Sequence, residues 1–259
     1  MQPANAFRRA LLARRQQIGL WCTLSSPYVT ELVAGSGFDW LLIDTEHSPT
    51  EVADVLSQLQ AAAPYPGSVV VRPASNDPVL IKRLLDLGAQ TLLVPYVQNA
   101  QEAQQAVRSM RYAPRGIRGV SALTRATRFG RVARYSQTCE EDLCLVVQVE
   151  TVEALAEIES IAGVEGVDAI FVGPADLAAT MGLAGQPSHP EVVAAVDGAI
   201  RRIVRAGKPA GVLTPDEGFA RKFIEAGSTF TAVGIDAGLL ARESAALAKR
   251  FSAASPFVN

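Results

Sequence analysis

Acidic side chains follow two short apolar segments of the chain, at positions that favour a metal site. Segment 170–177 (IFVGPADL) runs through Gly-Pro to Asp176, and segment 145–151 (LVVQVET) contains Glu150 after its apolar run. A buried carboxylate is costly unless a cation or hydrogen-bond donors satisfy it. Each acid could instead cap the helix that follows it. Because both follow neighbouring strands, we expect them to hold a metal together, since two carboxylates plus waters are the usual protein ligands of Mg2+ or Mn2+.

Two further polar groups follow predicted strands, and both could take part in a reaction. Segment 44–47 (DTEH) ends one strand and Arg72 ends the next. His47 is the histidine available as a base near neutral pH, because His189 begins a predicted helix. Asp44 is a candidate partner for its ring. Arg72 could direct a planar donor at a carboxylate or enolate oxygen. A solvated loop histidine and a simple ion pair of the arginine are the structural alternatives.

These side chains require a scaffold that brings several strand ends together. Short apolar segments predict strands at 18–24, 40–44, 69–72, 91–95, 145–150, 169–173, 210–213 and 230–234. Capped patterns predict helices at 27–34, 50–63, 77–87, 99–111, 151–162, 189–206, 216–226 and 238–251, after an amphipathic N-terminal helix. The alternation predicts an α/β fold, a (β/α)8 TIM barrel forming one domain over residues 1–259. An open doubly wound sheet would need a GxGxxG motif, which the sequence lacks.

The composition of the chain indicates which partners, cellular compartment and catalytic chemistry to expect. The chain has 259 residues, 49% of them hydrophobic, and a formal net charge of -2, so we expect neither nucleic acid nor a membrane surface as partner. No apolar run approaches the roughly 20 residues of a transmembrane helix. Three cysteines without a CxxC pair fit a reducing, cytoplasmic setting. None of the four lysines ends a predicted strand, so a lyase of this sequence would use a metal and not a Schiff base.

An arginine-rich stretch interrupts the regular alternation. Eight arginines lie between Arg108 and Arg134, and segment 112–142 is long for a connection between two barrel elements. RNA binding is disfavoured, because the stretch has few aromatic residues and the molecule is not basic overall. We expect a subunit interface, or a site for an anionic arm of the substrate.

Several stretches together resemble a known family. FDWLLIDTEH (38–47), segment 70–95, RYAPRGIRGVS (111–121), VQVET and IFVGPADLA are similar to the class II pyruvate-dependent aldolases, the hydroxy-keto-acid aldolase (HpcH/HpaI) family. The resemblance extends from about residue 17 to residue 251. It implies a class II aldolase that cleaves 4-hydroxy-2-oxo acids reversibly into pyruvate and an aldehyde.

The resemblance leaves the substrate open. The subgroup that acts on 4-hydroxy-2-oxoheptane-1,7-dioate, with succinate semialdehyde as the aldehyde, is most similar. The subgroup for 2-dehydro-3-deoxyglucarate is nearly as similar, and the length of loop 119–128 suits it better. A CoA-thioester lyase and a non-catalytic oxo-acid-binding protein are the remaining alternatives.

The resemblance also implies roles for single residues. The metal ligands would be Glu150 and Asp176, the base His47 and the transition-state arginine Arg72. Asp44 and Asp86 would be acidic neighbours of the histidine, with Asp86 raising its basicity. The implied substrate contacts are Gln148, Gly173, Pro174, Ala175, Asp176 and Leu213. The implied cofactor is Mg2+, Mn2+ or Co2+. The implied assembly is a hexamer of dimers that exchange their C-terminal helices.

Overall fold

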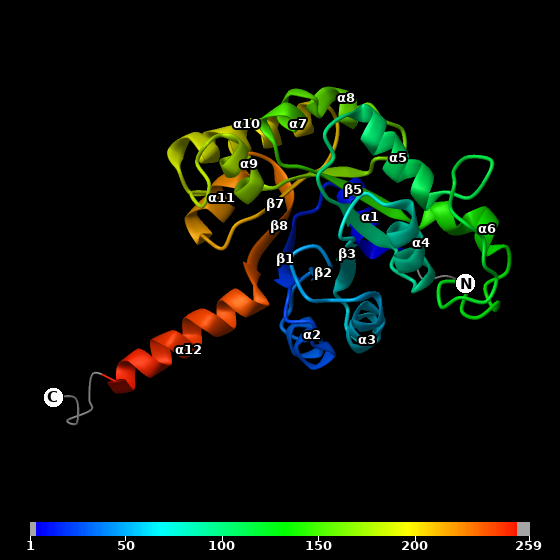
Figure 1. The fold of residues 1–259 in the computed structure, drawn as a ribbon, viewed down its shortest axis with the longest axis horizontal. Coiled ribbons are helices and arrows are strands. Elements are labelled where there is room, and N and C mark those ends of the chain that lie inside the picture. The colour runs from blue at the N-terminus through cyan, green and yellow to red at the C-terminus, as the bar shows by residue number, and fades with distance from the viewer. Residues whose placement is uncertain (1–3, 253–259) are drawn as a thin grey trace.

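Eight parallel strands form a closed barrel at the centre of the computed structural model, which describes residues 4–252 (Figure 1). Neighbours in sequence pair with each other, and β1 pairs with β8 to close the barrel. The strands are β1 (Gln17–Cys22), β2 (Trp40–Asp44), β3 (Ser68–Arg72), β4 (Thr91–Val94), β5 (Cys144–Val149), β6 (Ala169–Val172), β7 (Ala210–Leu213) and β8 (Ser228–Ile235). The predicted (β/α)8 barrel is confirmed, and every predicted strand is present.

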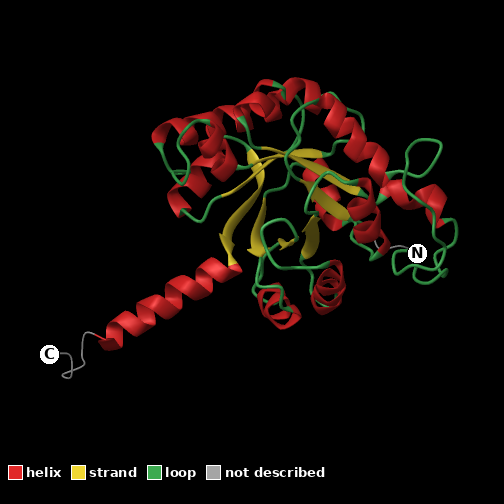
Figure 2. Cartoon of the chain, in the orientation of Figure 1, coloured by secondary structure: helices red, strands yellow, loops and turns green. Residues whose placement is uncertain are grey.

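Helices lie outside the strands (Figure 2). They are α1 (Ala6–Leu12), α2 (Pro27–Ala34), α3 (Val52–Ala62), α4 (Pro78–Asp86), α5 (Ala100–Met110), α6 (Tyr135–Thr138), α7 (Val152–Ala156), α8 (Ile158–Ala162), α9 (Pro174–Thr180), α10 (Pro190–Arg205), α11 (Glu217–Glu225) and α12 (Asp236–Ser252), with a 3-10 turn at Cys139–Glu141. Among residues 4–252, no helix combines the length and the apolar character that crossing a membrane requires.

Three helix predictions were wrong in detail. The closing helix, predicted to start at residue 238, begins at Asp236. The helix predicted to start at Thr50 begins at Val52, because Glu51 is its N-cap and the Asp54 carboxylate accepts a hydrogen bond from the Glu51 amide at 2.9 Å. The helix predicted over 151–162 is two short helices, α7 and α8. They are separated at Glu157, whose ψ of 9° leaves the helical region.

Aromatic side chains fill the barrel interior and close its amino end. The inner cluster includes Phe7, Trp21, Trp40, Phe171 and Phe230. Phe7, from α1, lies across the amino end, with its ring centroid 5.6 Å from that of Trp40 and 5.7 Å from that of Phe230. The interior is therefore a packed core, and the barrel opens to solvent at the carboxyl ends of the strands.

Two glycines make room for two of these rings. A Cβ atom at Gly19 of β1 would overlap the Trp40 indole, and one at Gly211 of β7 would overlap the Phe230 ring. Any other residue at these positions would force the aromatic core to move.

The last helix, α12, extends away from its own barrel (Figure 1). Every residue from Leu240 to Phe251 is exposed, and Leu240 is 61% and Leu247 49% accessible to solvent. Leucine and phenylalanine side chains are most often buried against other protein atoms. The helix thus presents an apolar face that its own chain does not cover within the described residues.

Candidate active site

A cavity of about 340 Å³ opens at the carboxyl end of the barrel. Ten of the residues singled out from the sequence line it, namely Asp44, His47, Arg72, Gln148, Glu150, Gly173, Pro174, Ala175, Asp176 and Leu213. Four lining residues were not predicted: Trp21, Thr23, Phe171 and Ile235. These come from apolar strand segments or their ends, where a residue facing the mouth has the same sequence pattern as one facing the core.

Arg72 is held rigidly by two carboxylates. Strands β2 and β3 pair with Asp44 opposite Arg72, so the side chains meet at the end of the sheet. The guanidinium donates Nε to Asp44 Oδ1 at 2.8 Å and Nη2 to Asp44 Oδ2 at 2.7 Å, while Nη1 lies 2.7 Å from Glu46 Oε2. Its central carbon lies 5.4 Å from the centroid of the Trp21 ring, a cation–π contact. The arginine is therefore fixed in plane and direction before any substrate arrives.

The charges around Arg72 keep it cationic despite its burial. Burial alone would lower the pKa of Arg72, but the hydrogen bonds and charge of Asp44, with the charges of Glu46 and Glu150, raise it overall. Burial raises the pKa of Glu46, although Arg72 and His47 act in the opposite direction. Glu46 was not among the predicted site residues, yet it stands in the same DTEH segment as Asp44 and His47.

His47 lies at the rim of the cavity with its ring largely in solvent. Its side chain is 65% exposed, and Nε2 is 3.8 Å from Glu46 Oε2. The predicted pairing of His47 with Asp44 is not formed, because both Asp44 oxygens accept hydrogen bonds from Arg72. The acidic neighbour of the histidine in this structure is Glu46.

Glu150 is buried at the end of β5, where it accepts two hydrogen bonds. Oε1 accepts from the Tyr96 amide at 2.8 Å, and Oε2 accepts from the side-chain amide of Gln148. Burial raises the pKa of Glu150 to about 7; the charges of Glu46 and Asp176 act in the same direction and the two hydrogen bonds oppose it. A cation beside this carboxylate would favour its ionised form.

Gly173 allows these side chains to cross the top of the barrel. A Cβ atom at this position would lie 2.8 Å from Glu150 Cβ and 2.9 Å from Gln148 Nε2. Real side chains do not approach so closely, so the close contact between β5 and the start of α9 depends on a glycine at position 173.

The donor set at the cavity fits a hard divalent cation. Asp176, in the first turn of α9, is half-buried, and no hydrogen bond or ion pair joins its carboxylate to another residue of the described chain. The buried Gln148 Oε1 also lacks a hydrogen-bond partner there. No group of three or more His, Cys, Asp or Glu residues within 4–252 has the geometry of a metal cluster. Two carboxylates with open positions for water and substrate are the arrangement that Mg2+ and similar ions commonly use.

Asp86 does not belong to this site within one chain. It is the last residue of α4, which leads away from the carboxyl end of β3, and it forms an ion pair with Arg118 at 2.9 Å. Helices of a (β/α)8 barrel run back toward the amino ends of the strands. The expected contact of Asp86 with His47 is therefore absent from the single chain.

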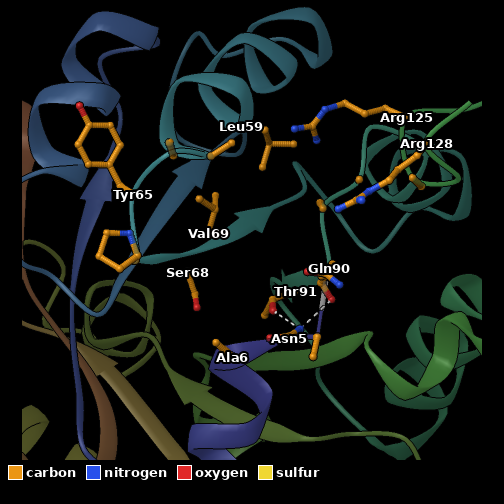
Figure 3. A pocket seen from close by; sticks show the side chains of 18 of the residues that line it. Asn5, Ala6, Leu59, Tyr65, Ser68, Val69, Gln90, Thr91, Arg125 and Arg128 are labelled. Carbon is orange, nitrogen blue, oxygen red and sulfur yellow. Dashed lines mark hydrogen bonds between the residues drawn. The ribbon is translucent and has the colours of Figure 1, made fainter. Parts of the chain in front are cut away.

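A larger cavity, of about 580 Å³, lies at the amino end of the barrel and shares no residue with the mouth (Figure 3). None of its lining residues is an acid or a histidine. We assign the chemistry to the smaller cavity, because the carboxylates, His47 and Arg72 converge there.

Comparisons with known proteins identify the family of the chain. The family model described as HpcH/HpaI aldolase/citrate lyase matches residues 17–242. A pyruvate aldolase of Rhizobium etli is 64% identical over 250 residues, covering 96% of this chain and 98% of that protein. A 4-hydroxy-2-oxo-heptane-1,7-dioate aldolase of Shigella sonnei is 57% identical over 256 residues, or 98% of each. The crystal structure of an HpcH/HpaI aldolase/citrate lyase family protein from Burkholderia cenocepacia superposes with a TM-score of 0.92 at 38% identity, covering 96% of this chain and 100% of that one.

Proposed function

The chain belongs to the HpcH/HpaI aldolase/citrate lyase family, and we propose that it cleaves 4-hydroxy-2-oxo acids into pyruvate and an aldehyde. Family membership and the named relatives make it a carbon–carbon lyase of the aldolase type. The observation that carries the proposal is the convergence of Glu150, Asp176, His47 and Arg72 on one cavity.

Glu150 and Asp176 would hold a divalent metal such as Mg2+, Mn2+ or Co2+ at the mouth. Such an ion, when bound, supplies a Lewis acid for the 2-oxo group and the carboxylate of the substrate. Gln148, whose amide nitrogen already donates to Glu150, and the main chain at Ala175 would hold the same end of the substrate.

His47 would act as the base. It takes the proton of the 4-hydroxyl group, and the C3–C4 bond of the substrate then breaks. The electron pair of that bond forms the enolate, with the negative charge on the C2 oxygen. The same imidazole can return the proton to C3, which completes pyruvate. The rim position of His47, beside Glu46, suits a group that must give and take protons.

Arg72 would stabilise the negative charge that develops on the enolate oxygen. Its donors are held in direction by Asp44 and Glu46, so little reorganisation is needed during the reaction. The cavity of about 340 Å³ suits a small oxo acid.

The names of several relatives support one preferred substrate. We propose 4-hydroxy-2-oxoheptane-1,7-dioate, with succinate semialdehyde as the second product, because relatives at 57% identity bear that name. Pyruvate release should be compared for this acid, 2-dehydro-3-deoxyglucarate and a citramalyl thioester of CoA. We expect the highest kcat/KM for the first; a faster second or third substrate would reassign the enzyme. Tight pyruvate binding with no cleavage of any acid would indicate a binding protein.

We further propose that α12 is exchanged with a second copy of the chain, within a hexamer. The support is the exposed apolar face of α12 and the exposed Tyr28 and Leu32 of α2, which are 80% and 66% accessible. Three buried cysteines, none in a disulfide, support a reducing, cytoplasmic setting.

A further inference from the structure

The amino-end cavity, shown in Figure 3, is bounded by several parts of the chain. They are the start of α1, the end of α3, the two segments that lead into β3 and β4, the loop 125–128 and Tyr135 of α6. Its volume of about 580 Å³ lies within the range of small-molecule sites, roughly 300 to 1,000 Å³. Nothing in the proposed aldol reaction uses this end of the barrel.

The charged side chains that line this cavity are all positive. Arg125 and Arg128 are the only charged residues among those that line it, and Figure 3 shows both guanidinium groups directed into it. Other arginines of the same segment are paired with acids: Arg111 and Arg115 lie 3.2 and 2.9 Å from Glu140. Within residues 4–252, Arg125 and Arg128 form no such ion pair. The cavity therefore carries positive charge that the described chain does not neutralise.

Arg125 is fixed by main-chain contacts that leave most of its donors free. Its Nη1 donates to the Leu87 carbonyl at 2.7 Å, beyond the end of α4. Gly88, with φ +91°, makes room, since a Cβ atom there would lie 2.9 Å from Nη1. Burial lowers the pKa of Arg125, and no carboxylate offsets this effect. Capping the end of α4 uses one N–H donor of Arg125. Among the residues that the structure describes, the rest of the half-buried guanidinium has no charged partner.

The loop holds the second arginine in a set position. Arg128 has a left-handed backbone with φ 50°, and its amide donates to the Arg125 carbonyl at 2.9 Å. Between them, the buried Thr127 hydroxyl lies 2.8 Å from the Ala122 carbonyl and accepts a hydrogen bond from the Gly130 amide at 3.1 Å. A side chain in such a backbone conformation persists only where its surroundings enforce it. The turn brings both guanidinium groups to the same cavity.

Part of the cavity wall is apolar, with Leu59 and Ala62 from α3, Val69 from β3 and Ala89 before β4. We propose that the amino-end cavity binds a small organic anion. Its carboxylate or phosphate would contact Arg125 and Arg128, and its compact apolar body would pack against this wall.

Calorimetric titration of the full-length protein tests the proposal. The probes are benzoate and phenyl phosphate, with benzyl alcohol as the neutral analogue and inorganic phosphate as the head group alone. We expect one site per chain for an aromatic anion, weaker binding of inorganic phosphate and none of benzyl alcohol. Which of the two anions binds more tightly distinguishes a carboxylate ligand from a phosphate ester.

Variants localise the binding. Arg125→Gln and Arg128→Gln should each weaken it about tenfold or more, the usual effect of losing a charge-assisted hydrogen bond. Arg131→Gln is the matched control, since Arg131 is exposed on the same loop and does not line the cavity. Ala63→Trp, at an exposed lining position, should block binding by volume while the circular dichroism spectrum stays unchanged.

Several results would overturn the proposal. They are the absence of binding at millimolar anion, equal weakening by Arg131→Gln, and undiminished binding to Ala63→Trp. Inorganic phosphate binding as tightly as phenyl phosphate would remove the apolar contact from the proposal. Because Arg128 caps no helix, Arg128→Gln keeps the test decisive if Arg125→Gln fails to fold.

Discussion

At the scale of single residues, the arrangement around Arg72 matters more than its charge alone. Asp44 binds one edge of the guanidinium through Nε and Nη2, and Glu46 lies beside the third nitrogen, so the plane of the group is set by β2 and the segment that follows it. A lysine at this position would keep the positive charge without the fork that matches Asp44.

We therefore predict that Arg72→Lys lowers kcat for pyruvate release by about 100- to 1,000-fold, the usual effect of losing one such donor. Circular dichroism and metal affinity should stay close to those of the wild type. Arg202→Lys, in an ion pair with Glu159 on the outer surface, is the matched control and should keep full activity. Near-normal kcat in Arg72→Lys would remove Arg72 from the mechanism.

Glu150 gives the site a dependence on pH. Its pKa of about 7 lies above the ordinary value of 4.5, so the metal-free carboxyl group is largely neutral at pH 6. A metal must then displace a proton, and its affinity should fall up to about tenfold for each pH unit below 7. Calorimetric Mg2+ titrations at pH 6, 7 and 8 would measure this fall and the released protons. An affinity that does not change over this range would contradict it.

The same raised pKa has a consequence for stability. The pKa of Glu150 is higher in the folded chain than its ordinary value of 4.5. Its contribution to stability is therefore complete below pH 4.5 and is lost as the pH rises through about 7. The metal-free protein should therefore lose unfolding free energy between pH 5 and pH 8, and saturating Mg2+ should restore it at pH 8. A chelator-treated sample whose Tm does not decrease over this range would argue against the assignment.

At the scale of elements, the barrel was predictable because its strands are buried on both faces. Strands such as β2 and β5 are apolar along almost their whole length, which a surface loop or helix rarely is. The start of α3 and the break at Glu157 were missed because they depend on local hydrogen bonds and backbone angles, and not on periodicity.

The placement of the candidate site residues was predictable only in part. Asp176 and Arg72 line one cavity, as expected, because the carboxyl ends of parallel strands meet at one mouth. The contact of Asp44 with Arg72 depends on the register of β2 with β3, which the sequence does not reveal. Arg125 and Arg128 lie in a loop without periodicity, so only the folded chain shows which cavity they face.

The aromatic interior makes a prediction about packing. Gly19→Ala should lower the unfolding free energy by about 1 to 3 kcal/mol, because its methyl group overlaps the Trp40 indole. Gly198→Ala in α10 is the matched control: a Cβ atom there meets nothing within 4 Å, and helix propensity should add about 0.5 to 1 kcal/mol. Urea unfolding of both variants measures the difference. Equal stability of the two would contradict the tightly packed interior.

At the scale of the whole molecule, the proposed exchange of α12 with a second chain makes a prediction about assembly. Leu240, Leu247 and Phe251 share one face of this helix at roughly 100° per residue, and all three are exposed. Leu247→Glu should therefore shift sedimentation toward smaller species, whereas Ala245→Glu adds the same charge on another face and should not. A wild-type protein that sediments as a monomer would contradict the exchange.

Metal dependence of pyruvate release tests the central claim most directly. The protein is stripped with a chelator, supplied with Mg2+, Mn2+ or Co2+, and assayed with racemic 4-hydroxy-2-oxoheptane-1,7-dioate. We predict that activity disappears with chelator, returns with metal, and survives borohydride in the presence of pyruvate. Activity that persists in the chelator, or that borohydride and pyruvate abolish, would contradict a site in which Glu150 and Asp176 hold the metal that drives the cleavage.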